Sequence, residues 1–244
     1  MFVVSLILNT LIMRLILLGL LIVSRSISAY GQDETVYFSD AIKTHLQKYN
    51  NQSDAEYEKG DTAKGQALFD SLVQNYLVGS RFNDFSFKSV DNRKVRLSKI
   101  KKPVFIITYA SWCVLGKGEV PALNKLARKY AKNIRFIVLF WDKKSEAKKI
   151  GRKFSGNITV CYANESYRND GRIVATLKHT LGFPVSYFLN SNLDVVDIKR
   201  GGVQTDPKMP FREAMTLNYN LFDDRLTECL LKKDLVKEQL VNTD

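Results

Sequence analysis

The chain has 244 residues, of which 45% are hydrophobic and 25% charged, and its formal net charge is +12. This composition is ordinary for a globular protein and excludes a disordered or fibrous chain. Three cysteines and two histidines, with no Cys-x-x-Cys pair, exclude a disulfide scaffold, and we expect neither a metal nor an organic cofactor.

The first 31 residues have the pattern of an export signal. Arg14 precedes the apolar run 15–23, and residues 26–31 are mostly small, as at a cleavage site. We therefore expect a protein exported to the periplasm; the alternative is an uncleaved signal that anchors the chain in the membrane. Since an exported protein rarely meets nucleic acid, the positive charge indicates a solvated basic surface, with association with an anionic membrane surface as the weaker alternative.

Residues 32–80 are predicted to form a helical N-terminal extension. The clearest piece is 67–77, whose apolar residues Leu68, Leu72 and Tyr76 recur at helical spacing. Gly79 follows as a helix stop.

From Arg81 onward, short strands alternate with helices. Strands are expected at 85–87, 95–97, 103–109, 134–140, 158–162, 184–189 and 193–198. Helices are expected at 120–130, 143–154 and 172–181, and from about residue 210 onward. The order predicts an α/β fold with a central mixed sheet flanked by helices, over 81–205, followed by a helical C-terminal extension over 206–244.

Cys113 is the strongest candidate for chemistry. It follows the apolar strand 103–109 and directly precedes a predicted helix. The positive end of a helix dipole stabilises a thiolate and lowers its pKa, and Lys117 would add positive potential. The competing interpretation is an inert buried cysteine.

The segment 110–121 resembles the active-site segment of TlpA-type thioredoxin-like proteins, whose pattern is Trp-Cys-x-x-Cys-x-x-Glu-x-Pro. Trp112, Cys113, Glu119 and Pro121 match this pattern in type and spacing, but Gly116 takes the place of the second cysteine. A second resemblance is the proline that opens the strand at 184–189, which is usually cis in the family. The resemblance covers about 81–203 and implies a thioredoxin-like fold.

The resemblance also implies roles for these residues. Cys113 would attack a disulfide sulfur, Trp112 would shield that sulfur, and a cis Pro184 would leave a peptide edge beside Cys113 free for a substrate strand. Phe183 would narrow the substrate cleft. Glu119 would either help to move protons or remain as a structural remnant.

Gly116 has no sulfur, so Cys113 cannot close a disulfide within this loop. Three outcomes stay open: a single-thiol exchanger resolved by an external thiol, a borrowed resolving cysteine (Cys161 or Cys229), or a binding module without redox activity. Thiols or disulfides of proteins or small molecules are the expected partners. Packing is the default interpretation of Cys161 and Cys229, and a disulfide between them is left open.

Two other enzyme classes fit the sequence less well. A one-cysteine peroxidase needs a hydroxyl three residues before its cysteine, where Ala110 stands. A Cys–His hydrolase would have to use His179, which we interpret as a helix-surface residue near the Pro184 loop.

Overall fold

The computed structural model describes residues 35–113, 115–201, 206 and 208–241. The described residues from Val36 onward belong to one compact unit. The predicted export signal at 1–31 lies outside the described residues. Among the helices that are described, none combines the length and the apolar character needed to cross a membrane.

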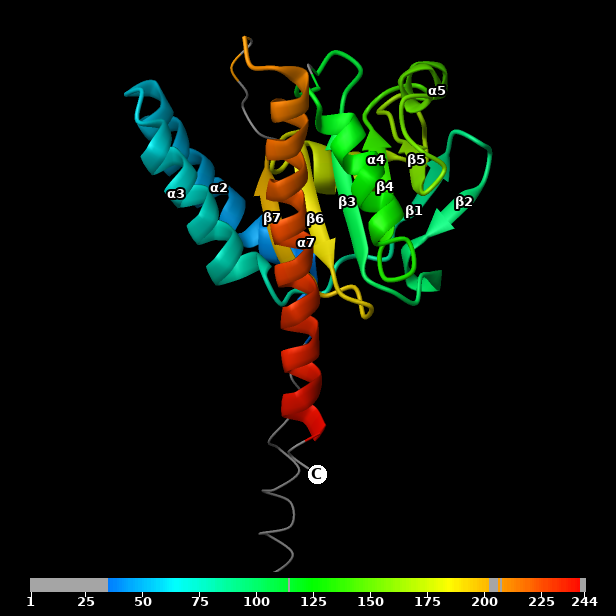
Figure 1. Ribbon diagram of the computed structural model, residues 1–244. Coiled ribbons are helices and arrows are strands. Elements are labelled where there is room, and N and C mark those ends of the chain that lie inside the picture. Colours follow the sequence, from blue (N-terminus) through cyan, green and yellow to red (C-terminus); the bar gives the residue numbers. More distant parts are fainter. Residues whose placement is uncertain (1–34, 114, 202–205, 207, 242–244) are drawn as a thin grey trace, which may run out of the picture. The chain divides into compact units, whose positions relative to one another are not determined.

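A seven-stranded mixed sheet forms the centre of this unit (Figure 1). Its order is β2-β1-β5-β4-β3-β6-β7. The strands are β1 (Ser86–Ser89), β2 (Lys94–Arg96), β3 (Val104–Tyr109), β4 (Arg135–Phe140), β5 (Ile158–Tyr162), β6 (Val185–Leu189) and β7 (Val195–Arg200). Strands β3, β4 and β5 run parallel, and the other neighbours pair antiparallel. Each predicted strand overlaps an observed one, and β3 is buried along its whole length, as its continuous apolar run predicts.

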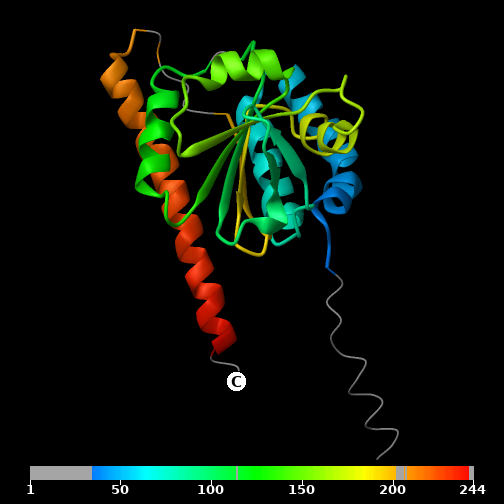
Figure 2. The same ribbon diagram turned by 90° about the vertical axis from the view of Figure 1, so that its right-hand side faces the viewer.

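Helices cover both faces of the sheet (Figure 2). One face packs against α4 (Glu119–Lys129), α5 (Lys144–Gly151) and α7 (Phe211–Val241). The other face packs against α2 (Phe38–Glu58), α3 (Thr62–Leu72) with its π-helical continuation η1 (Val73–Leu77), and α6 (Gly171–Ile173) with the π-helical turn η3 (Val174–Lys178). Helices α2 and α3 precede the sheet in the chain, and α7 follows it.

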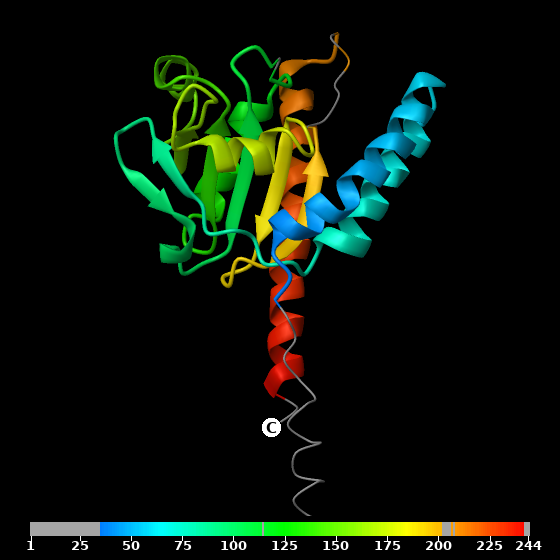
Figure 3. The same cartoon turned by 180° about the vertical axis from the view of Figure 1, so that it is seen from behind.

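The N-terminal helices are joined to the sheet by aromatic packing. Phe38 of α2 contacts Phe82 at 5.1 Å and Tyr187 of β6 at 6.0 Å between ring centroids. The Phe38 amide also donates to the Arg81 carbonyl oxygen at 2.9 Å. Figure 3 shows α2 and α3 side by side at the β7 edge of the sheet.

Candidate functional site

Cys113 lies in the loop that follows β3, at the carboxyl end of the parallel strands. Its amide donates to the Ala110 carbonyl oxygen at 2.9 Å, and its sulfur accepts the Ala110 amide at 3.4 Å. The side chain is half-buried against the core, and the cysteine is free. The thiol is therefore held in a tight turn with part of its surface open to solvent.

The predicted position of Cys113 at a helix N-terminus is wrong. Helix α4 begins at Glu119, and Gly118 precedes it with a left-handed φ of +77°. A Cβ on Gly118 would lie 2.5 Å from the backbone of Met215 in α7, so a larger residue does not fit there. Because the chain turns at this glycine, the helix starts too late for its dipole to act directly on the sulfur.

The predicted lowering of the Cys113 pKa is also wrong: its pKa is raised from the ordinary value. Burial is the main cause, and the carboxylates of Asp142 and Glu119 add to it. The hydrogen bond from the Ala110 amide opposes this shift. The Lys117 ammonium donates to the Met209 carbonyl oxygen at 2.7 Å.

Asp142 is a site residue that the sequence interpretation missed. It follows β4, and it accepts the Ser111 amide at 2.7 Å and the Ser111 hydroxyl at 2.5 Å. These two bonds join the loop after β3 to the loop after β4. The carboxyl ends of neighbouring parallel strands meet at one edge of a sheet, so the sequence could indicate that these two loops are neighbours but not which residues join them.

Glu119 is buried and both of its carboxylate oxygens accept hydrogen bonds. The Tyr109 hydroxyl donates to Oε1 at 2.5 Å, and the Gly116 amide donates to Oε2 at 2.7 Å. Burial raises the Glu119 pKa, while the two donors oppose that shift. The fully buried Tyr109 has its pKa raised well above the ordinary value, by burial and by Glu119. Pro121 lies in the first turn of α4, where a missing N–H costs no helical hydrogen bond.

Two of the predicted substrate residues, Trp112 and Phe183, are in contact with each other. The Phe183–Pro184 peptide bond is cis. The Phe183 ring contacts the Trp112 ring edge to face, at 5.3 Å between centroids. Trp112 is 74% exposed, whereas Phe183 is half-buried against the core. The structure therefore brings the loop of Cys113 and the loop of Pro184 together.

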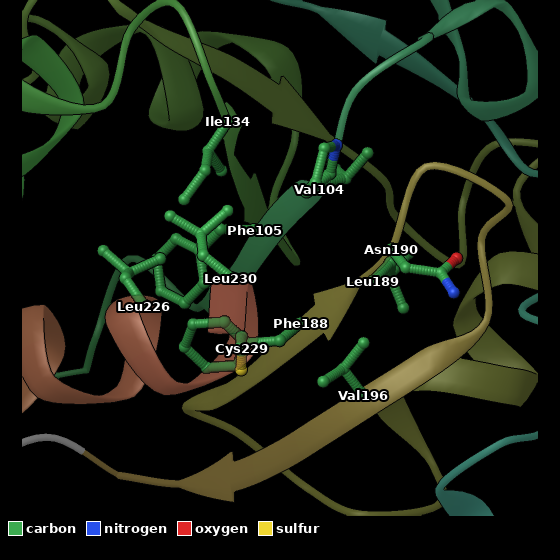
Figure 4. A pocket seen from close by; sticks show the side chains of 11 residues that line it. Val104, Phe105, Ile134, Phe188, Leu189, Asn190, Val196, Leu226, Cys229 and Leu230 are labelled. Carbon is green, nitrogen blue, oxygen red and sulfur yellow. The ribbon is translucent and has the colours of Figure 1, made fainter. Parts of the chain in front are cut away.

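The other two cysteines lie on opposite faces of the sheet, and neither is in a disulfide. Burial raises the Cys161 pKa to about 12. Cys229 of α7 lines a small apolar cavity of about 20 Å³ with Phe105, Phe188 and Leu226 (Figure 4). Neither position fits a resolving thiol, and the Cys161–Cys229 disulfide that the sequence left open is not formed. His179 is exposed and lies 3.6 Å from a Glu165 carboxylate oxygen, as a surface residue would.

Comparisons with known proteins find similarity over part of the chain. Residues 78–168 match the model of the AhpC/TSA family. The thioredoxin-like protein YneN of Bacillus subtilis is 24% identical over 124 residues, which cover 50% of this chain and 71% of YneN.

Two solved structures are similar to this chain at comparable sequence identity. A candidate thiol:disulfide interchange protein DsbE from Chlorobium tepidum is 22% identical, covering 63% of this chain and 97% of that one, with a TM-score of 0.47. A thio-disulfide isomerase from Thermus thermophilus is 21% identical, covering 62% and 96%, with a TM-score of 0.44. The chain has a thioredoxin-like fold, in which the Cys113 loop after β3 contacts the loop of the cis Pro184 through the Trp112 and Phe183 rings.

Proposed function

We propose that this protein carries out thiol–disulfide exchange through Cys113 alone. The observation that carries the proposal is the position of this thiol: it is half-exposed, in a loop joined to the cis Pro184 loop by the Trp112–Phe183 ring contact. Exchange requires a thiolate that can reach a disulfide sulfur. Cys161 is fully buried and Cys229 packs between α7 and the sheet, so neither offers such access.

Trp112 and Phe183 are suited to hold an extended substrate beside the thiol. Their edge-to-face pair presents an apolar ridge, most of it from the exposed Trp112. A peptide strand would lie along the backbone of residues 183 and 184, with its disulfide above Cys113. Glu119 acts as a positioning residue in this proposal, because its carboxylate holds the Gly116 amide and so fixes the far side of the loop.

The exchange proceeds in two steps, formation of a mixed disulfide and its resolution. The Cys113 thiol first loses its proton to solvent, and the thiolate attacks one sulfur of a substrate disulfide. A mixed disulfide with Cys113 forms, and the other substrate sulfur leaves as a thiolate that takes up a proton. An external thiolate, such as that of a small-molecule thiol, then attacks the substrate sulfur of the mixed disulfide and releases Cys113 as thiolate. Gly116 contributes no sulfur to the second step.

The raised pKa of Cys113 favours a second candidate, a binding module without redox turnover. A thiol whose pKa is raised is mostly protonated at neutral pH and attacks slowly. In this alternative the Trp112–Phe183 ridge holds an extended peptide, and Cys113 only packs beneath it. Cys113→Ser would then leave peptide binding unchanged.

Trapping with oxidised glutathione separates the two candidates. We expect the wild-type chain to gain one glutathione on the peptide that contains Cys113, with the rate rising at alkaline pH. Cys113→Ser should abolish this adduct, whereas Cys229→Ser, which removes the other half-buried thiol, should leave it unchanged. A folded wild-type chain that forms no adduct at Cys113 would exclude thiol exchange and leave the binding module.

We also propose that the mature protein is extracytoplasmic and begins after the apolar segment at 15–23. The support is the charge and apolar pattern of the first 31 residues. N-terminal sequencing of the protein purified from its natural compartment tests this. A mature chain that starts at Met1 or Met13 would contradict cleavage.

A further inference from the structure

A basic pocket lies at the end of the sheet opposite Cys113. Cys113 follows the carboxyl end of β3, whereas the pocket is at the amino ends of β4 and β5, which run parallel to β3. Its volume is about 260 Å³. The edge strand β2, the segment after it and the first residues of β4 and β5 line it: Arg93, Lys94, Val95, Arg96, Lys99, Ile100, Arg135 and Thr159.

Five of these eight lining residues are cations, and none is an acid. Two of the cations have partners outside the lining: Arg93 lies 3.3 Å from Asp91, and Arg96 lies 2.7 Å from Asp84. Within the described residues, no ion pair joins Lys94, Lys99 or Arg135 to a carboxylate. The pocket therefore holds an excess of positive charge.

The positive charge of the pocket also affects the pKa of a neighbouring lysine, Lys102. The pKa of Lys102 is lowered by burial and by the Arg135 guanidinium beside it. Like charges held close together destabilise one another, and an anion between them removes that cost. The folded protein thus maintains a positive potential at this pocket that its own carboxylates do not cancel.

The lining has the chemistry that recognises phosphate. Arginine presents a planar fork of N–H donors that matches phosphate oxygens, and lysine adds a point charge. Thr159 contributes a hydroxyl, and Val95 and Ile100 contribute apolar surface among the charges. The pocket is open and lies on an edge strand, so a ligand can enter without a rearrangement of the core.

We propose that this pocket is a binding site for a ligand that carries phosphate groups. The pocket is separated from the Cys113 loop by the length of the central strands. No residue of that loop lines the pocket. Its ligand is a compact anion that bears phosphate, either free in solution or as the headgroup of an anionic lipid.

Calorimetric titration of the full chain with inorganic pyrophosphate tests the proposal. The pocket variant is Lys94→Gln, Lys99→Gln and Arg135→Gln, and the matched control is Lys148→Gln, Lys149→Gln and Arg128→Gln. Both variants remove two lysines and one arginine, all of them exposed. We expect saturable binding of one pyrophosphate by the wild type, affinity lower by about tenfold or more in the pocket variant, and a change below about twofold in the control. Retained thermal unfolding of both variants checks the fold.

Flotation with vesicles of phosphatidylglycerol in phosphatidylcholine distinguishes the two ligand sources. If the pocket variant alone loses vesicle binding, the headgroup is the ligand. If it loses pyrophosphate binding while vesicle binding equals that of the control, the ligand is a free anion. Equal losses in the pocket and control variants, or no pyrophosphate binding by the wild type, would overturn the proposal, since the charge would then act only as a general basic surface.

Discussion

The two ends of the sheet differ in the sign of the charge that surrounds them. At the carboxyl end, the carboxylates of Asp142 and Glu119 act on Cys113 and help to raise its pKa. At the amino end, five cations line one pocket. The protein carries a net charge of +12, yet its candidate nucleophile experiences negative rather than positive charges.

This difference shows that net charge does not predict the potential at a site. Coulomb interactions weaken with distance, and salt screens exposed charges over about 10 Å, so only neighbouring groups decide a thiol pKa. Helix α4 would be the usual source of positive potential for a thiol here, but it begins six positions after Cys113 because of the turn at Gly118. The loop thus combines an accessible sulfur with an unfavourable charge environment.

Among substitutions at the carboxyl end of the sheet, Gly116→Cys should have the largest effect. This substitution places a second sulfur three residues after Cys113, at the position of the second cysteine in the Trp-Cys-x-x-Cys pattern. We expect an oxidised form with an intraloop disulfide and a catalytic reduction of protein disulfides that the wild type lacks. Mass spectrometry should show the loss of two hydrogen atoms. In Gly116→Ser, a matched polar control, neither effect should occur; a Gly116→Cys chain that keeps both thiols free under oxidants would contradict the loop geometry.

Tyr109→Phe tests whether the buried carboxylate depends on its donor. The variant leaves Glu119 Oε1 without the hydroxyl that now donates to it, and a buried acceptor without a partner costs about 1–3 kcal/mol. Urea denaturation should show this loss of unfolding free energy. Tyr130→Phe is the matched control, because Tyr130 donates to the more exposed Asp223 and should cost less than about 1 kcal/mol. Equal losses of unfolding free energy in the two variants would mean that the Tyr109 hydrogen bond gives the buried Glu119 carboxylate no particular stabilisation.

Trp112→Ala tests the aromatic ridge at the same end. Since Trp112 is 74% exposed, we expect little effect on folding, within about 0.5 kcal/mol. The loss of the ring contact to Phe183 should weaken binding of an extended disulfide peptide by about fivefold, near 1 kcal/mol. Fluorescence anisotropy in a Cys113→Ser background measures noncovalent binding alone. Phe211→Ala, at another exposed aromatic side chain, should not alter it; unchanged affinity in Trp112→Ala would remove the ridge from the proposal.

Asp142→Asn should have the smallest effect of these substitutions. It tests whether a negative charge near Cys113 raises the pKa of the thiol. Asparagine keeps an oxygen acceptor for Ser111 but removes the negative charge that helps to raise the Cys113 pKa. We expect a lower pKa and about threefold faster alkylation at neutral pH. Asp91→Asn, in the turn between β1 and β2, is the control and should leave the rate unchanged. A slower or equal rate in Asp142→Asn would show that its hydrogen bonds, not its charge, govern the thiol.

Much of the fold follows from local patterns in the sequence. Continuous apolar runs predicted β3 and β4, and the sheet order places them at the centre as expected for strands buried on both faces. The ends of the helices are less predictable. The segment at 67–77 is α-helical only to Leu72 and then continues as the π-helix η1, which packs on β7.

The candidate site was predicted only in part, since its chemistry depends on contacts between distant segments. The motif located Cys113, Trp112 and Pro184 near one another. It gave no sign that Gly118 would be pressed against Met215, 97 positions away by sequence number, which moves the start of α4. It also could not assign Asp142, because no local pattern states which residue of the β4 loop reaches Ser111.

The most direct test of the account is the pH dependence of Cys113 alkylation by iodoacetamide, followed on its peptide by mass spectrometry. Burial and the two carboxylates raise the thiol pKa, so the thiolate fraction is small at neutral pH and grows as the pH rises. We expect a midpoint above that of free cysteine, with complete modification at high pH because the sulfur is accessible. A midpoint below that of free cysteine, or a Cys113 that stays unmodified at every pH in the folded protein, would contradict it.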